Sequence, residues 1–338
     1  MTFSKQTGLP SLLSDANLKN LRFITQSAFA LFCLYSGFRF YQFYLWALDK
    51  SDVYVPRPQV VEGFLPIGAF MNLKRFVFTG NYDKIHPAGL TIFIAVLVIG
   101  LLFRKGFCGW ICPVGFASNL AERFSLKFKL LRRLPVWIDY PMFAPKYLIF
   151  FFFSFFIVLK MDTLTIEDFN NSPFNLVADA KMLLFFLKPS SLTIWVLSFL
   201  VAISFVLRNF WCRYLCPYGT MLGLLALFSP VKIRRDPERC IDCRKCEKAC
   251  PALILVPEGE TVYNLECIGC LECVAACPVE DCLSVTAGQR KIPAFWLPVG
   301  IVGLFLLIWA VAKLSGHWQS AVPLDLFKEY YQALLPAG

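Results

Sequence analysis

The sequence predicts a mainly α-helical membrane protein, a polytopic helical bundle with a small cysteine-rich domain inserted before its last helix. Hydrophobic residues make up 57% of the 338 residues and charged residues only 17%, a balance typical of chains that span a bilayer. Of the 14 cysteines, all but Cys33 lie in four tight groups. Such close spacing suits metal ligation better than disulfide bonds.

Five apolar segments are about long enough to cross a bilayer core of about 30 Å, which takes about 20 helical residues. They are residues 21–48, 88–103, 144–161, 192–210 and 293–312. Two shorter apolar stretches, residues 64–78 and 182–187, are expected to be interfacial or re-entrant. The sequence therefore predicts about five transmembrane helices plus short interfacial helices.

The loops between these segments differ in their lysine and arginine content. The set made of the N-terminus through Arg22 and residues 104–146 and 208–291 holds 22 basic residues, and the opposite set holds 11. Basic loops remain on the cytoplasmic side of a membrane, so all four cysteine groups are predicted to face the cytoplasm. We interpret the net charge of +10 as favouring contact with an anionic membrane surface. No nucleic acid is expected as a partner. Residues 1–20 show no signal-peptide pattern.

The strongest motif is a repeated cysteine run after the fourth apolar segment. Each copy reads C-x2-C-x2-C-x3-C-P, from Cys240 to Pro251 and from Cys267 to Pro278. In such runs three thiols hold one [4Fe–4S] cluster and the fourth reaches the other cluster. The predicted ligand sets are Cys240, Cys243, Cys246 and Cys277 for one cluster, and Cys267, Cys270, Cys273 and Cys250 for the other. Structural zinc is the alternative, but zinc sites usually take widely spaced Cys pairs without a crossed ligand. The runs thus predict a bacterial-type 2[4Fe–4S] ferredoxin domain.

The two halves of this predicted domain differ in charge. Residues 232–250 carry seven basic and four acidic side chains, whereas residues 258–281 carry six acidic side chains and no basic one. Because reduction adds negative charge to a cluster, the cluster of the second run is predicted to have the lower potential. The alternative is that solvation of both faces makes the difference negligible. Cys282 is interpreted as a spare thiol rather than an alternative ligand, since eight ligands are already supplied.

A second pair of motifs lies at the predicted cytoplasmic ends of two spans. Cys108 and Cys112, like Cys212 and Cys216, belong to an aromatic-C-x3-C-P-x-G sequence. If the turn stays helical, thiols at i and i+4 share one face. We expect the four thiols to share one further iron–sulfur cluster at the membrane edge. Buried free cysteines, a redox-active disulfide, or a copper or zinc site are the alternatives.

The combination resembles the NapH/NosR/CcoG group of membrane polyferredoxins and, within it, the YccM-type electron transport proteins. The resemblance covers most of the chain. It is carried by both cysteine motifs and by Arg57-Pro-x3-Glu62-Gly-x-Leu-Pro66-Ile, Met71-Asn-Leu-Lys74 and Ser229-Pro-x-Lys-Ile-Arg-Arg235. It implies a multi-pass protein of the bacterial inner (cytoplasmic) membrane with two [4Fe–4S] clusters. The implied partners are lipid, a quinone as mobile substrate, and a soluble or membrane redox protein such as a cytochrome, ferredoxin or reductase.

The sequence thus predicts an electron-transfer subunit of a quinol/quinone oxidoreductase. A thiol-rich membrane copper or zinc reductase or sensor is the alternative. The expected division is a membrane domain of residues 1–230, a ferredoxin-like domain of 231–290, and a final transmembrane helix with an outer-side tail in 291–338. No catalytic residue is assigned. Polar residues near the outer side are weighed as contacts of a quinone head group, but each is more typical of an interfacial or capping role: Arg57, Glu62, His86, Asp168, Asp179 and Lys181.

Overall fold

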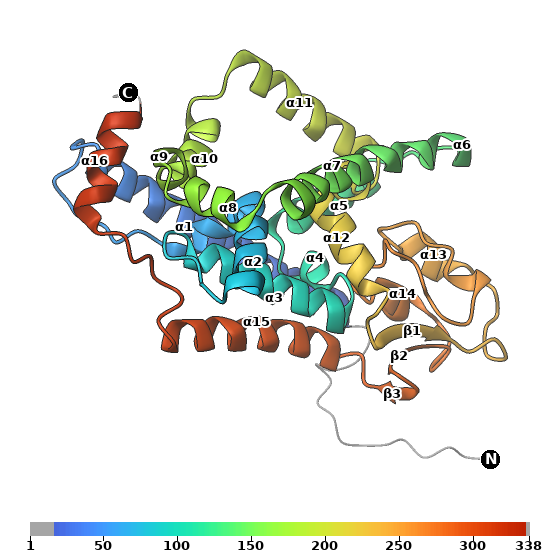
Figure 1. Ribbon diagram of the computed structural model, residues 1–338. Helices are drawn as coiled ribbons and strands as arrows, with labels where there is room; N and C mark the ends of the chain where they lie inside the picture. The colour runs from blue at the N-terminus through green and yellow to red at the C-terminus, as the bar shows by residue number, and fades with distance from the viewer. Residues whose placement is uncertain (1–16, 336–338) are drawn as a thin grey trace.

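The computed structural model describes residues 17–335 (Figure 1). The part of the predicted N-terminal polar segment up to residue 16 lies outside this range. The helices of the bundle are α1 (Leu18–Ala47), α2 (Pro66–Thr79), α3 (Pro87–Phe103), α4 (Gly106–Trp110), α5 (Pro113–Lys127), α6 (Val136–Asp139), α7 (Ala144–Ser154), α8 (Thr163–Asn170), α9 (Pro173–Leu176), α10 (Ala178–Leu187), α11 (Ser191–Val206), α12 (Pro217–Ala226), α15 (Trp296–Leu314) and α16 (Leu324–Leu334). Short 3-10 or π turns add η3 (Gln59–Phe64), η4 (Pro141–Phe143), η5 (Phe155–Lys160), η6 (Trp211–Leu215) and η7 (Val256–Glu258).

A small domain with a three-stranded sheet lies between α12 and α15. Its elements are β1 (Val231–Arg235), α13 (Lys245–Ala249), α14 (Glu272–Ala276), β2 (Leu283–Ala287) and β3 (Arg290–Ile292). The strands are antiparallel in the order β1-β2-β3, with Ile233 opposite Val285 and Val285 opposite Ile292. The small domain lies at one end of the molecule, and α16 lies at the other (Figure 1).

Two helical stretches are long and apolar enough to cross a membrane, Val136–Lys160 and Trp296–Leu314. The pair α10 and α11, bent by 76°, makes a third candidate if it forms one broken span. Helix α3 is apolar but has only 17 residues. Helix α1 has 30 residues, but it buries polar side chains such as Arg22 and Gln26 on its inner face. Of the five predicted spans, two therefore correspond to helices that are long and apolar enough to cross a membrane, and three do so if the bent pair is counted as one span.

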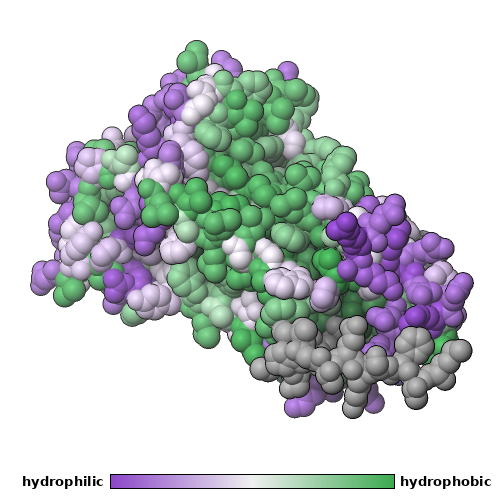
Figure 2. All heavy atoms as spheres, turned by 90° about the horizontal axis from the view of Figure 1, so that it is seen from below, coloured by the Kyte–Doolittle hydropathy of each residue, from purple (hydrophilic) through white to green (hydrophobic). Residues whose placement is uncertain are grey.

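The surface supports a membrane location for the bundle. Figure 2 shows hydrophobic side chains over the middle of the molecule and hydrophilic ones over its two ends. Many large apolar side chains of α7 and α11 are exposed, among them Phe152 and Trp195. Exposed apolar surface of this extent is typical of a face that meets lipid or another protein.

Helix α3 is the centre of the bundle, packed by α2, η3, α12 and α15. Its neighbours approach closely through glycine: a Cβ added at Gly100 would lie 2.9 Å from the Leu222 side chain of α12. The small domain is joined to this centre by one continuous core. Trp110 and Ile301 of the bundle belong to the same buried cluster as Ile233, Val285 and Leu271 of the small domain. The two parts are thus packed together and not merely tethered.

Candidate iron–sulfur and thiol sites

The two ferredoxin-type runs fold with the same local backbone. In each run a left-handed residue precedes the second cysteine, Asp242 (φ 49°) or Gly269 (φ 61°). A second left-handed residue follows that cysteine and caps a five-residue helix, Arg244 before α13 and Leu271 before α14. Alternation of right-handed and left-handed backbone conformations directs successive N–H groups toward one concave space, as in known iron–sulfur sites. The last cysteine of each run, before its proline, ends the short helix.

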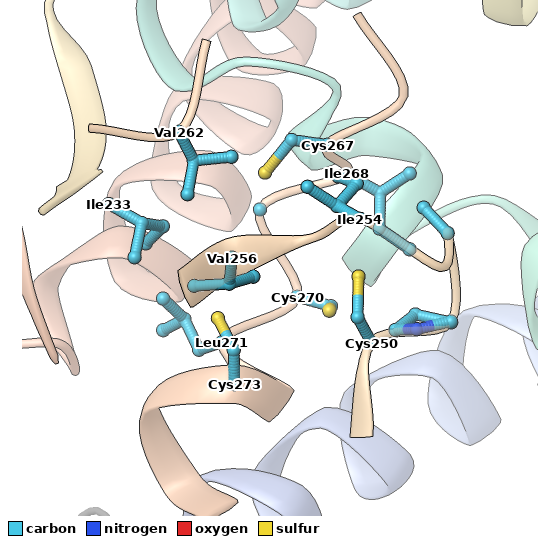
Figure 3. A pocket seen from close by; sticks show the side chains of 13 residues that line it. Ile233, Cys250, Ile254, Val256, Val262, Cys267, Ile268, Cys270, Leu271 and Cys273 are labelled. Carbon is cyan, nitrogen blue, oxygen red and sulfur yellow. The ribbon is translucent and has the colours of Figure 1, made fainter. Parts of the chain in front are cut away.

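The deeper pocket gathers one predicted ligand set. Cys250, Cys267, Cys270 and Cys273 line it together, and Figure 3 shows their sulfur atoms around one space. The rest of the wall is almost entirely apolar: Ile233, Ile254, Val256, Val262, Ile268 and Leu271. Burial raises the pKa of the free Cys250 thiol to about 11 and that of Cys270 to about 12. We call this the membrane-side pocket because Trp110 of α4 donates a hydrogen bond to Gly269 O at 3.0 Å.

The outer pocket gathers the other predicted set, Cys240, Cys243, Cys246 and Cys277. Cys243 is exposed to solvent, so we call it the solvent-side pocket. Its wall also contains Arg235 and the buried Cys282. A side-chain hydrogen bond from Arg235 lowers the pKa of Cys240. The predicted spare thiol therefore lies in the wall of this pocket, next to Cys240 and Cys277.

The donor sets fit [4Fe–4S] clusters. Each pocket offers four thiols, the ligand set that such a cluster takes. Within residues 17–335, no group of three His, Cys, Asp or Glu side chains converges on the position of a single metal ion. The thiols are instead spread around the pocket wall, as a cluster requires when each of its four irons takes its own thiolate.

The C-x3-C-P motifs form two equivalent half-sites, but not on continuous helices. Cys108 lies in α4 and Cys212 in the π turn η6, whereas Cys112 and Cys216 are the N-caps of α5 and α12. The following prolines occupy the first helical positions, where no N–H is needed. The chain thus turns between the two cysteines, and the helical face considered for i and i+4 is not formed.

The glycine of the first motif has a steric role. A Cβ added at Gly115 would lie 2.4 Å from the carbonyl oxygen of Cys108, closer than any side chain allows. The equivalent distance in the second motif, from Gly219 to Cys212 O, is a tolerable 3.5 Å. The N–H of Gly219 donates to the Cys216 sulfur at 3.4 Å. The motif therefore folds the chain back on its first cysteine and directs an N–H group at the second.

All four of these cysteines line one cavity of about 400 Å³. Ser118 of α5 lies 3.7 Å from the Cys212 sulfur, which joins the two half-sites. The Lys105 ammonium lies in the same wall and donates to Glu266 at 3.2 Å. Lys146 donates to the other oxygen of Glu266 at 2.6 Å. Cys33 of α1, the isolated cysteine of the sequence, also lines this cavity, which we call the thiol cavity.

The charged triad of Lys105, Lys146 and Glu266 was not predicted from the sequence. Glu266 lies 161 positions from Lys105 and 120 from Lys146, so no local pattern relates the three residues. Both ammonium groups are buried, and the side chain of Glu266 is 13% exposed. Burial would raise the pKa of Glu266, but the two lysines outweigh it, and the pKa is lowered. The carboxylate thus ties the small domain to the start of α4 and to α7.

Four of the polar residues weighed as quinone contacts come together, and they line neither the two ferredoxin-type pockets nor the thiol cavity. Arg57 pairs with Glu62 at 2.7 Å and with Asp179 at 2.6 Å. His86 lies 3.6 Å from Glu62, and Tyr331 of α16 donates to Asp179 at 2.8 Å. These buried groups satisfy one another, as a structural ion network does.

The other two weighed residues lie apart from this network. Asp168 is exposed on α8. Lys181 lies over the ring of Phe174, 4.1 Å from its centroid. The six residues therefore do not form one site.

Comparison with known proteins finds iron–sulfur families over both kinds of cysteine motif. Residues 85–131 and 187–236 match the family model described as "4Fe-4S binding domain", and residues 232–278 match "4Fe-4S dicluster domain". Each of the first two segments contains one C-x3-C-P motif. The "Putative electron transport protein YccM" of Escherichia coli is 39% identical over 85% of this chain and 81% of that protein. The chain belongs to the family of ferredoxin-type membrane electron transport proteins.

More distant members share parts of the chain. The "Uncharacterized protein MJ0749" of Methanocaldococcus jannaschii is 31% identical over 62% of this chain and 74% of that protein. "Protein NirI" of Paracoccus denitrificans is 30% identical over 56% of this chain, which is 28% of that protein. No solved structure matches.

Proposed function

We propose that this protein passes electrons between a redox protein at the solvent-side pocket and a quinone in the membrane. The supporting observation is that three thiol-lined spaces follow one another through the molecule. The solvent-side pocket includes the exposed Cys243. The membrane-side pocket shares Pro251, Ala252 and Ile268 with the thiol cavity. The membrane-side pocket and the thiol cavity are therefore adjacent, and the two ferredoxin-type pockets are linked by the packing of α13 against α14.

The eight ferredoxin-type cysteines are the proposed ligands of two [4Fe–4S] clusters, which when bound supply one-electron transfer. Cys240, Cys243, Cys246 and Cys277 would hold the first, and Cys250, Cys267, Cys270 and Cys273 the second. The apolar wall around the second set excludes water. Arg235 donates to a ligand sulfur of the first set, which favours its reduced, more negative state.

We assign the cysteines of the thiol cavity, Cys108, Cys112, Cys212 and Cys216, to a third iron–sulfur cluster. Their gathering from two half-sites around one space supports this assignment. Lys105 lies close enough to Cys108 and Cys216 to interact with both thiols. A buried cation stabilises thiolates and the net negative charge of a thiolate-bound cluster.

The proposed topology places the small domain and all the cluster sites on the cytoplasmic side of a bacterial inner membrane. The excess of basic residues in the loops of that side supports it. We retain the division into a membrane domain of 1–230, a ferredoxin domain of 231–290 and a final helix with its outer-side tail in 291–338. Ile241 is 66% exposed beside the exposed Cys243, and this face is the proposed contact for the soluble redox partner.

Iron and sulfide analysis of the protein purified without oxygen tests the proposal. About twelve iron atoms per chain would support three clusters, and about eight would leave two. The double variant Cys108→Ser and Cys212→Ser should lose only the iron of the third cluster. Colourless protein that holds zinc or no metal would overturn the proposal.

A further inference from the structure

The thiol cavity is much larger than a cluster site. The two ferredoxin-type pockets, each lined by a predicted set of four ligands, have volumes of about 20 Å³, whereas the thiol cavity has about 400 Å³. Four thiols therefore line a space that one cluster leaves mostly free. A volume of this size is typical of pockets for small organic molecules.

The free part of the cavity is apolar and aromatic. Its walls come from five elements that are distant in sequence. They include Phe29, Phe32 and Cys33 of α1, Val60, Gly63 and Phe64 of η3, Phe107 of α4, Tyr218 of α12 and Phe305 of α15. Aromatic walls favour a flat ring, which stacks on them or meets their edges.

Two of these aromatic side chains lead to the outer surface of the bundle. Phe32 is 51% exposed and Phe64 is 46% exposed, although both also line the cavity. They come from α1 and η3, which pack against each other. An apolar molecule dissolved in the lipid can therefore enter between these two elements without crossing water.

A polar group lies at the thiol end of the cavity. The Lys105 side chain is 3% exposed, and its ammonium lies 3.8 Å from a Cβ placed on Gly219. The ammonium donates to Glu266 and has three hydrogens to donate. It can therefore also donate to a carbonyl oxygen of a ring that enters from the α1 side.

We propose that the thiol cavity binds the ring of a lipid-soluble quinone between Phe32, Phe64 and Lys105. This rests on the proposed electron-transfer function and places its membrane substrate beside the four thiols. It also moves the quinone site away from the Arg57–Glu62–Asp179 network, whose charged groups already satisfy one another. The isoprenoid tail of the quinone would leave between α1 and η3.

Photolabelling of the full chain with its clusters, in lipid nanodiscs, tests this site. The probe is a short-chain azidoquinone, and mass spectrometry locates the label. We expect label on residues 29–33, 60, 63 or 64, and we expect unmodified menaquinone to compete for it. Cys33→Trp fills the cavity and should lower the affinity for the probe roughly tenfold, equivalent to about 1.4 kcal/mol. Leu34→Trp is the matched control, because Leu34 follows on the same helix and is 71% exposed.

The inference is overturned if the label falls on residues 57, 62, 86 or 179 with Cys33→Trp unaffected, or if a saturated phospholipid competes as well as the quinone. Iron content and the dithionite-reduced EPR spectrum are measured on each variant. Normal clusters without labelling reject this site but leave the proposed function standing, whereas absent clusters reject the proposed function itself. If Cys33→Trp fails to fold, Val60→Trp fills the same space from η3.

Discussion

The solvent-side and membrane-side pockets come from the same cysteine pattern but lie in opposite surroundings. The solvent-side pocket has an exposed cysteine, two arginines and a fifth thiol in its wall. The membrane-side pocket is enclosed by apolar side chains and closed by α4 of the bundle. An identical local backbone can therefore produce two redox sites with different potentials, because the surroundings and not the ligands distinguish them.

The comparison also changes the reason for the predicted order of potentials. Glu266 and Glu272, two of the six carboxylates near the second run, are paired with Lys105 and Arg22. Their charge is therefore largely compensated. The apolar wall still opposes the added negative charge of a reduced cluster. We continue to expect the lower potential on the membrane side, now because of burial.

The largest expected effect is the loss of a ligand from each pocket. Cys250→Ala and Cys243→Ala should each remove about four iron atoms per chain. Cys250 is 8% exposed and belongs to the shared core, so only its loss should also destabilise the fold substantially. Iron analysis and thermal unfolding measure the two effects. If Cys243→Ala lowered the unfolding temperature as much as Cys250→Ala, the proposed difference between the two pockets would be wrong.

The next effect concerns the attachment of the membrane-side pocket. Glu266→Gln leaves the buried Lys105 and Lys146 without a counter-charge, which typically costs about 3–5 kcal/mol. The small domain of this variant should open from the bundle, with faster hydrogen exchange in residues 264–273. Glu280→Gln is the control, because Glu280 is exposed near the solvent-side pocket. If hydrogen exchange in residues 264–273 were unchanged in Glu266→Gln, the proposed role of Glu266 in holding the small domain against the bundle would be wrong.

A smaller effect is expected on the potential of the solvent-side cluster. Arg235→Gln removes the guanidinium that donates to Cys240, so the potential should fall by about 60 mV, equivalent to about 1.4 kcal/mol for one electron. Arg234→Gln is the control, since the Arg234 side chain is exposed and bonds to Thr261. EPR redox titration measures both variants. An equal shift in the control would assign the effect to net charge alone.

The smallest effect is expected for Cys282→Ala. Cys282 lies in the wall of the solvent-side pocket, but the other four thiols already match one cluster. The variant should keep its full iron content and lose about 1 kcal/mol of stability, as small buried truncations do. Iron analysis after purification without oxygen is sufficient. Loss of about four iron atoms would make Cys282 a ligand.

The sequence allowed prediction of the features that depend on local spacing. The two cysteine runs, each of eleven residues, predicted two sets of four ligands, and each set lines a pocket of its own. The apolar segments predicted a helical bundle, of which two or three helices are candidate spans. The geometry of the C-x3-C-P turns was not predicted, because Pro113 and Pro217 begin new helices. The Lys105–Glu266–Lys146 triad depends on packing between distant segments and has no local signature.

The shared core has a consequence for how the protein is made. Leu18 of α1, Trp110 of α4 and Ile301 of α15 pack in the same buried cluster as the walls of the membrane-side pocket. A ribosome must therefore release almost the entire chain before that pocket is enclosed. Iron delivered earlier would meet a pocket that is still open to water. We therefore expect the membrane-side cluster to be inserted last, after α15 has entered the membrane.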